Sequence, residues 1–172
     1  VGIIKSPEFG IVCPTYPQNF FFGGDASAVL NLSGKDKKSN WFTGRNRKYI
    51  APTELGDFRM MLRTAIGLAR SVRRMHQAGL AHSDLSCNNV LIDPKTGSSV
   101  VIDIDSLVVP NKYPPEVCGT RGYIAPEVLA TMGLQGDSKR CLPCVQTDLH
   151  ALPVLMYEYL FLRHPLIGPK IY

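Results

Sequence analysis

The sequence lacks the features that mark a membrane protein or a disulfide-stabilised secreted protein. None of its apolar runs is long enough to cross a bilayer, and its first residues are too short an apolar run for a secretory signal. Its five cysteines are odd in number and scattered, so no disulfide framework follows from them. These absences favour a cytoplasmic protein in a reducing compartment, without a membrane partner.

A cysteine-based metal centre is also missing. Cys141 and Cys144 form a single CxxC pair, and a structural zinc site would need two more ligands of this kind. A redox role for the pair would need a strand followed by a helix, which the sequence does not indicate at this place. We therefore interpret these thiols as incidental.

Charge of one sign does not dominate the chain. The formal net charge of the 172 residues is +5, and the basic residues are spread out apart from small clusters at 35–38 and 45–48. A mild positive potential suits a polyanionic nucleotide, and we expect no nucleic-acid binding by this portion. With 45% hydrophobic residues, the chain can bury the core of one domain or of part of a larger one.

Apolar spacing predicts two helices. Residues 54–78 carry apolar side chains at three- and four-residue steps, and Thr53 and Gly79 suit the start and the end of this helix. Arginines occupy its other face, which we interpret as a solvated surface. Residues 148–162 are apolar on nearly every side, which indicates a helix buried in the core.

Shorter elements are predicted around these helices. Residues 17–51 are irregular and polar in their second half, so they indicate a long loop or insertion with a short helix at 26–32. Residues 127–132 suit another short helix. Short strands are predicted at 2–5, 10–13, 90–92 and 100–102, the last two as a hairpin.

The residues between 82 and 103 carry the most chemical information. Asn89 follows Asp84 by five residues, and Asp103 ends an apolar strand. Phosphoryl transfer from a metal-bound nucleotide needs one carboxylate to accept a proton from the attacking hydroxyl, and an amide oxygen and a second carboxylate to hold Mg²⁺ on the phosphates. Singly, these residues also fit a turn and solvated strand ends. A third block, residues 119–127, follows them in the chain. The order and spacing of the three blocks favour phosphoryl transfer over a set of unrelated turns.

With these motifs, the chain from about residue 10 to 165 resembles the large lobe of a protein kinase. The resemblance implies a protein kinase-like α+β fold, mainly a helical C-terminal lobe with a catalytic β-hairpin. Residues 1–16 would be the end of the small lobe and the hinge. Residues 17–172 would be a partial large lobe, with the activation segment at 103–127.

The resemblance assigns a role to each matching residue of the loop. Asp84 would be the catalytic base, and Asn89 and Asp103 would bind Mg²⁺ on ATP. His82 would pack under the metal-binding motif. Thr120 matches the hydroxyl that bonds the catalytic Asp in serine/threonine kinases, whereas tyrosine kinases usually differ there, so a protein Ser/Thr substrate is expected.

Two further carboxylates would have structural roles. Glu127 would pair with an Arg from a later helix, and Asp148 would tie the catalytic-loop backbone to the buried helix. The alternative for Asp148 is a plain helix N-cap, with Thr147 as its competitor. By the same resemblance, the nucleotide would be bound by the hinge residues Cys13, Pro14 and Tyr16 and by Leu91, with Cys13 as gatekeeper.

Three substitutions depart from the usual kinase pattern. Ser83 replaces the Arg that receives an activation-loop phosphate, so activity is predicted not to need phosphorylation at Ser106, Tyr113 or Thr120. Ser86 replaces the Lys that neutralises the transferred phosphate. Asp105 replaces a Gly. This pattern resembles a bacterial group of kinase-like proteins, some of which are fused to other domains, so fused or separate regulatory domains are expected.

A glycine-rich phosphate loop and a strand lysine with a glutamate partner are both missing. Lys5 follows a strand, but only a turn separates it from the next strand, so we interpret it as a surface residue. We expect this portion alone to bind Mg-ATP poorly and to be inactive.

Three functions compete on this evidence. The first is a serine/threonine protein kinase of which this chain is the large-lobe portion. The second is a catalytically inactive kinase-like regulatory or scaffold protein, suggested by Ser83, Ser86 and Asp105. The third is a small-molecule phosphotransferase of the aminoglycoside type, against which residues 125–127 (Ala-Pro-Glu) argue.

Overall fold

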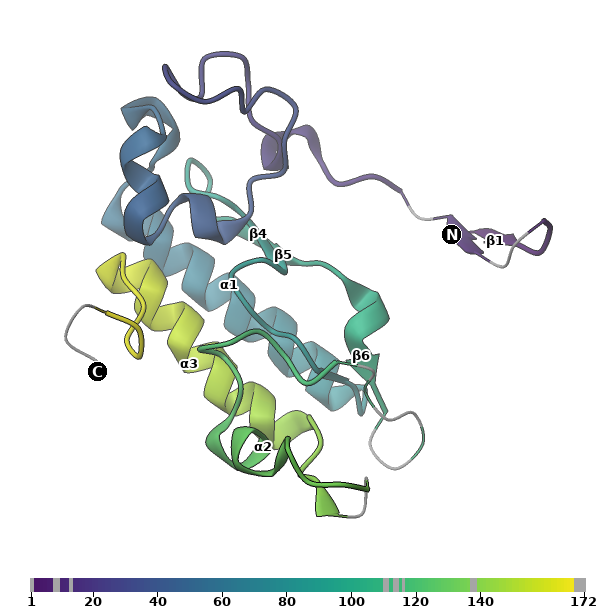
Figure 1. Ribbon diagram of the computed structural model, residues 1–172. Coiled ribbons are helices and arrows are strands. Elements are labelled where there is room, and N and C mark those ends of the chain that lie inside the picture. The colour runs from purple at the N-terminus through teal and green to yellow at the C-terminus, as the bar shows by residue number, and fades with distance from the viewer. Residues whose placement is uncertain are drawn as a thin grey trace.

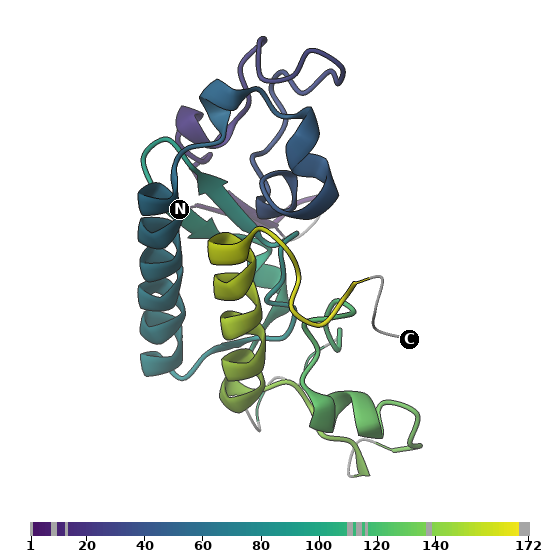
Figure 2. The same cartoon turned by 90° about the vertical axis from the view of Figure 1, so that its left-hand side faces the viewer.

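Two long helices lie side by side at the centre of the fold (Figures 1 and 2). The computed structural model describes residues 2–7, 10–12, 14–109, 112, 115, 117–136 and 139–168. Helix α1 spans Phe58–Gln77 and helix α3 spans Val145–Phe161. The last turn of α1 meets the first turn of α3, so the two helices run antiparallel.

Both helices begin at other residues than the sequence predicts. The side chain of Asp57 accepts a hydrogen bond from the Met60 N–H and caps α1, whereas the predicted cap, Thr53, lies in a preceding 3₁₀ turn, η4 (Pro52–Glu54). Helix α3 starts three residues before the predicted start, at a capping box formed by Cys144 and Thr147. The N-cap alternative for Asp148 is therefore wrong.

The predicted hairpin is present beside α1. Strand β4 (Val90–Asp93) pairs antiparallel with β5 (Ser98–Val101). Gly97 in its turn has φ +71°, and a Cβ there would lie 2.7 Å from the Arg63 Cβ of α1. The close packing of the turn on the helix therefore requires glycine at this position.

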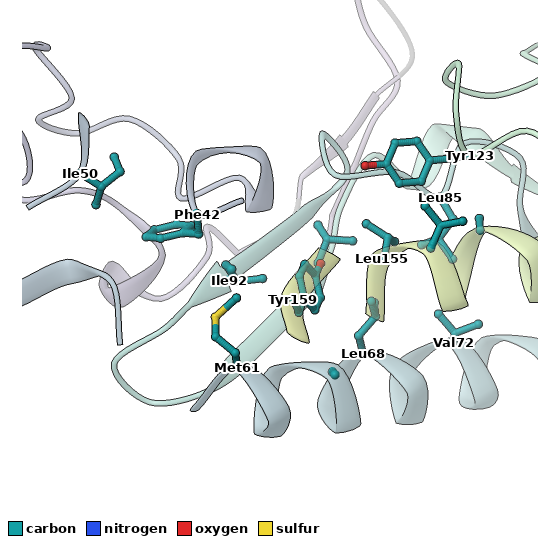
Figure 3. Close-up of a cluster of buried hydrophobic side chains, with 14 of the residues drawn as sticks. Phe42, Ile50, Met61, Leu68, Val72, Leu85, Ile92, Tyr123, Leu155 and Tyr159 are labelled. Atoms are coloured by element: carbon teal, nitrogen blue, oxygen red, sulfur yellow. The ribbon is translucent and has the colours of Figure 1, made fainter. Parts of the chain in front are cut away.

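The main core lies between the helices and this hairpin. Figure 3 shows Met61 and Leu68 of α1 close to Leu155 and Tyr159 of α3, with Ile92 of β4 above Met61 and beside Tyr159. These side chains are buried, as expected for the cores of the two predicted helices, but Leu149 and Phe161 are exposed, so α3 is not buried on every side. Leu85, which follows Asp84, belongs to the same cluster, so the loop that carries Asp84 is built directly on the core of the fold.

The segment between residues 18 and 54 consists of 3₁₀ helices and turns: η1 (Gln18–Phe20), η2 (Ser39–Trp41), η3 (Gly44–Tyr49) and η4. The helix predicted at 26–32 does not form. The Ser27 side chain accepts hydrogen bonds from the N–H groups of Val29 and Leu30, and these contacts hold a turn instead. The segment still contributes buried side chains, among them Phe22 and Phe42.

The N-terminal residues form a separate hairpin. Strands β1 (Gly2–Ile4) and β2 (Gly10–Val12) pair antiparallel, close to the predicted bounds. Figure 1 shows this hairpin away from the helices, joined to them by an extended stretch.

The remaining elements complete an α+β fold, as predicted. Strand β3 (Ala81–His82) pairs with β6 (Leu107–Val108), η5 (Ile104–Ser106) precedes β6, and helix α2 spans Pro126–Thr131. Among the residues that the structure describes, no helix is long and apolar enough to cross a membrane.

Candidate active site

Two neutral donors hold the side chain of Asp84. Asn89 Nδ2 donates to Asp84 Oδ2 and to the Asp84 backbone carbonyl, each over 2.9 Å. The Thr120 hydroxyl donates to Asp84 Oδ1 over 2.6 Å. The structure thus brings three of the predicted site residues together, although Thr120 lies 36 residues along the chain from Asp84.

The turn before β4 positions Asn89. Its N–H donates to the Ser86 carbonyl over 3.0 Å, and its own carbonyl accepts from the Ile102 N–H over 2.9 Å. Because Asn89 Nδ2 makes both contacts to Asp84, the amide oxygen is the atom that this side chain can offer to a cation.

His82 holds the residue that precedes Asp103. Its ring is buried, its Nε2 donates to the Ile102 carbonyl over 3.0 Å, and its Nδ1 accepts from the Asp84 N–H over 3.2 Å. These contacts place the proton on Nε2. Ile102 is bonded at both its N–H and its carbonyl, so Asp103 follows a firmly held residue next to Asn89.

Asp103 adopts a backbone conformation that residues other than glycine rarely adopt. Its φ is 62° and its ψ is 54°, in the left-handed region. Such backbone strain persists where the surroundings impose it, and it is common at functional sites. The side chain of Asp103 is exposed, and so is that of Asp105.

Asp148 ties α3 to the catalytic loop. Its Oδ2 accepts from the His82 N–H over 2.9 Å and lies 2.8 Å from His76 Nε2. Burial raises the pKa of Asp148 above its usual value, while the contacts to His82 and His76 act in the opposite direction. The side chain therefore lies where the resemblance predicts the tie between helix and loop.

No positively charged side chain of the described residues forms an ion pair with Asp84 or Asp103. The ion pairs present involve Lys37, Lys95 and His76. Nor do these residues contain a group of three or more His, Cys, Asp or Glu arranged to hold a metal. The hydrogen bond from the Ile102 N–H to the Asn89 carbonyl places Asn89 beside the residue that precedes Asp103. Amide and carboxylate oxygens are suitable ligands for Mg²⁺, and the assignment of these two residues as its ligands stays a prediction.

Ser86 supplies no charge at the position where a Lys is usual. It is fully buried, and its hydroxyl oxygen accepts from the Asn88 N–H over 3.4 Å. Ser83 is also buried. Both serines therefore serve the packing of the loop beneath Asp84.

A buried hydrogen bond anchors the chain after Thr120 to α3. The Tyr123 hydroxyl donates to the Glu158 carboxylate, and burial raises the pKa of both groups. Glu127 lies nearby in sequence but is exposed in the first turn of α2, and no ion pair within the described residues includes it. Its predicted pairing with an Arg stays a prediction.

A family model for the protein kinase domain matches residues 42–170, well over half of the chain. The chain belongs to the protein kinase family. The match includes the Asp84, Asn89 and Asp103 region, and it begins inside the segment 17–51 that was predicted to be a loop or insertion. The hinge assigned to residues 10–16 lies outside the match.

Several serine/threonine kinases are similar to part of this kinase chain. The serine/threonine-protein kinase PSK1 of Saccharomyces cerevisiae is 30% identical over 95 residues, covering 55% of this chain and 6% of the yeast protein. The serine/threonine-protein kinase WNG2 of Toxoplasma gondii is 33% identical over 96 residues, covering 55% and 17%. The CBL-interacting serine/threonine-protein kinase 13 of Arabidopsis thaliana is 39% identical over 82 residues, covering 45% and 16%.

The kinase chain therefore spans a small part of the length of these relatives. All three come from eukaryotes, so the predicted bacterial origin has no support from them.

The residues predicted to bind the nucleotide are not gathered in this portion of the kinase. Pro14 and Tyr16 are exposed in the extended stretch after β2, and Cys13 lies outside the described residues. Leu91 is fully buried in a cluster with Phe20 and Ile102. Leu91 therefore offers no surface to a ligand in this arrangement, because the chain's own Phe20 packs in the same cluster.

Sequence reasoning missed several residues that support the site. Two of them contact predicted site residues: His76 contacts Asp148, and Ile102 contacts His82. The other two, Tyr123 and Glu158, anchor the segment that carries Thr120. The His76 contact to Asp148 joins residues 72 positions apart, and the Tyr123 contact to Glu158 joins residues 35 apart. Local spacing carries no signal for such pairs.

Proposed function

We propose that this chain is the large-lobe portion of a serine/threonine protein kinase that transfers the γ-phosphoryl group of ATP to a protein hydroxyl. Asp84 acts as the base that accepts the proton of the attacking hydroxyl. Asn89 and Asp103 hold Mg²⁺, and Thr120 positions Asp84. Membership of the kinase family supports the reaction class.

The observation that carries this proposal is the hydrogen bonding around Asp84. Both carboxylate oxygens accept from neutral donors, Asn89 Nδ2 and the Thr120 hydroxyl. A carboxylate held in this way is oriented, and no cation of the described residues forms an ion pair with it. These are the properties that a general base needs.

The bound metal would supply charge stabilisation on the transferred phosphates. The chain's own part is to orient the side chains of Asn89 and Asp103. Asn89 is held through its backbone and Nδ2, and the position of Asp103 follows from the two hydrogen bonds to Ile102. Preorganised groups of this kind lower the barrier because they need no rearrangement during the reaction.

One observation favours a catalytically inactive kinase-like protein as the second candidate. Ser86 is buried and uncharged where a Lys usually neutralises the transferred phosphate. A missing cation at this place weakens transition-state stabilisation. The experiment below separates the two functions.

The test is phosphate transfer by the full-length protein, extended on both sides of this chain. It is incubated with Mg-ATP labelled at the γ-phosphate, and labelling of protein and aminoglycoside acceptors is measured. We expect protein labelling, lowered about 10²- to 10⁴-fold by Asp84→Asn, since this is the usual contribution of a general base. Asp103→Asn should lower labelling strongly and raise the Mg²⁺ concentration that the remaining labelling requires.

Asp25→Asn is the matched control, because it removes an exposed carboxylate away from the site and should leave labelling unchanged. Equal labelling by Asp84→Asn and the wild type contradicts the role of Asp84. No transfer to any acceptor by a folded full-length protein favours the inactive candidate. Labelling of aminoglycosides alone favours a small-molecule phosphotransferase.

A further inference from the structure

Cys141 and Cys144 lie at the junction between α2 and α3. The Cys141 N–H donates to the Thr131 hydroxyl oxygen at the end of α2, over 2.8 Å. Cys144 is the N-cap of α3, where its Sγ accepts from the Thr147 N–H and its own N–H donates to the Thr147 hydroxyl oxygen. One cysteine is therefore held by each helix, with two residues between them.

The two thiols are free, partly exposed and in different surroundings. Burial, followed by the proximity of Cys144, raises the pKa of the Cys141 thiol. Cys144 occupies the N-terminus of a 17-residue helix, an environment that favours negative charge. A CxxC pair at a helix N-terminus is a common arrangement of redox-active dithiols. The structure thus supplies a helix directly after the pair, whereas no strand directly precedes the pair among the described residues.

A chain of hydrogen bonds leads from this junction to the candidate active site. The Cys144 carbonyl accepts from the Asp148 N–H over 3.2 Å. Asp148 Oδ2 accepts from the His82 N–H, and His82 Nε2 donates to the Ile102 carbonyl next to Asp103. These hydrogen bonds connect Cys144, through Asp148, to the loop that carries Asp84.

We propose that Cys141 and Cys144 form a reversible disulfide that disturbs the N-terminus of α3 and, through Asp148, the catalytic loop. In the dithiol state, the Cys144 thiol donates to Gln146 Oε1 over 3.2 Å and accepts from the Thr147 N–H. Disulfide formation removes the thiol hydrogen and turns Sγ toward Cys141. Both contacts are then lost, and the cap of α3 weakens.

The oxidant is a low-molecular-weight disulfide such as oxidised glutathione. The Cys144 thiolate attacks one of its sulfurs, forms a mixed disulfide and releases one glutathione thiolate, which takes up a proton. The Cys141 thiolate then attacks Cys144 Sγ and releases the second glutathione. The two cysteines lose two electrons and two protons, and one oxidised glutathione becomes two reduced molecules.

Cys118 is the nearby thiol that the test must distinguish. Arg140 Nη2 donates to Cys118 Sγ over 3.4 Å, and Cys118 and Pro143 line the same small cavity beside Asp84. A disulfide between Cys118 and either of these cysteines would not be the one proposed here. Cys118→Ser is therefore the matched control variant.

The first experiment needs no kinase activity. The full-length protein is equilibrated at a series of ratios of oxidised to reduced glutathione, free thiols are alkylated, and the peptides are analysed by mass spectrometry. We expect the peptide with both cysteines to lose two hydrogens. Cys141→Ser and Cys144→Ser should abolish this loss, whereas Cys118→Ser should retain it. Serine at position 144 is a good N-cap, so this variant should fold.

The second experiment measures hydrogen exchange of the His82 amide, which donates to Asp148. Oxidation should speed its exchange about tenfold in the wild type and leave it unchanged in Cys144→Ser. Phosphate transfer should fall on oxidation in the same variants, an expectation that rests on the proposed function. If the protein transfers no phosphate, the thiol and exchange measurements still decide the matter.

A disulfide that includes Cys118, a glutathione adduct that never resolves, or unchanged His82 exchange after oxidation would each overturn the proposal.

Discussion

Strand β4 carries a polar cluster at each end, and the two clusters differ in how their carboxylates are balanced. At its start, Asn89 and Thr120 hold Asp84 through neutral hydrogen bonds. At its end, Asp93 and Glu54 lie against Lys37, whose Nζ is 2.8 Å from Glu54 Oε2 and 3.9 Å from Asp93 Oδ1. The carboxylate at the start of this short strand therefore has no ion-pair partner among the described residues, whereas the carboxylates at its end are paired with a lysine.

The cluster at the end of β4 is buried and balanced in charge. Lys37, Glu54 and Asp93 are all nearly inaccessible, and Lys95 adds a second positive charge at Glu54. Two lysines thus face two carboxylates. Asp93 also accepts from the Asn19 amide and the Thr96 hydroxyl, so its oxygens are satisfied within the chain. This cluster joins the segment of 3₁₀ helices (residues 18–54) to the β4–β5 hairpin, and its carboxylates pair with lysines of the chain itself.

The contrast shows how to tell a functional carboxylate cluster from a structural one. Both are built from Asp, Asn or Glu near a strand end, and both are hydrogen-bonded. Only the cluster around Asp84 and Asp103 leaves its negative charge unneutralised among the described residues. A buried charge without a partner costs free energy, so such a cluster either stays partly exposed or binds a cation.

The largest effect on stability is expected for the ion-pair cluster of Lys37, Glu54 and Asp93 at the end of β4. Glu54→Gln leaves Lys37 buried without its nearest carboxylate, which should lower the free energy of unfolding by about 3–5 kcal/mol. Asp84→Asn should change it by less than about 1.5 kcal/mol, the scale of one ordinary hydrogen bond. Urea denaturation of both variants measures the difference. Equal losses would remove the distinction between the two ends.

A smaller effect is expected for the hydroxyl that orients Asp84. Thr120→Val removes the donor to Asp84 Oδ1, and a hydrogen bond to a charged group contributes about 1.5–3 kcal/mol, so turnover should fall roughly 10- to 100-fold. The KM for ATP should change little.

Thr120→Ser keeps the hydroxyl and should restore most of the turnover. Both variants are compared with the wild-type full-length protein by steady-state kinetics. Equal turnover for the Val and Ser variants would show that the contact to Asp84 does not position the base.

The smallest effect is the dependence of stability on pH. Burial alone would raise the pKa of Glu54, but hydrogen bonds and charges from Lys37 and Lys95 outweigh burial and lower it below its usual value of 4.5. Glu54 therefore stabilises the fold above about pH 4.5, and this contribution disappears as the pH falls through the lowered pKa. The stability difference between wild type and Glu54→Gln should shrink over this range.

Glu158, beneath Tyr123, should show the opposite slope. Burial raises its pKa above the usual 4.5, so the folded state keeps a proton that the unfolded state has lost. Its contribution is fully present below about pH 4.5 and is lost as the pH rises through the raised pKa. Relative to Glu158→Gln, the wild type should thus become less stable as the pH rises. Thermal melting of both variant pairs between pH 3 and 8 measures these slopes, and slopes of the same sign would contradict the assignment.

The sequence predicted the local parts of the fold and of the site well. The β4–β5 hairpin and the two helices formed close to the predicted residues, because turn residues and apolar spacing act over a few positions. Asp84 and Asn89 were assigned to one site from their order and spacing, whereas the hydrogen bond between them was not predicted. Thr120 came from the resemblance to kinases, and no local pattern would have found it.

The helix predicted at 26–32 fails for a local reason, the hydrogen bonds of Ser27. Other features escaped prediction because the partners lie far along the chain. Lys37 belongs to a segment predicted only as an irregular, polar loop, yet it is buried beside Glu54 and Asp93. Leu91 was expected to face a nucleotide, yet Phe20 packs in its cluster. In both cases a residue from the irregular segment decided the environment, and irregular segments have no periodicity from which burial can be predicted.

By itself, the sequence determined the two long helices and the β4–β5 hairpin, because these depend on neighbours within one or two turns of the chain, and it named the candidate acids. Only the tertiary structure decided which acids are neutralised. Charges interact through space, and the lysine that balances Glu54 and Asp93 comes from a distant segment, while Asp84 receives only an amide and a hydroxyl. That difference in three-dimensional surroundings separates the candidate active site from a structural ion-pair cluster on the same strand.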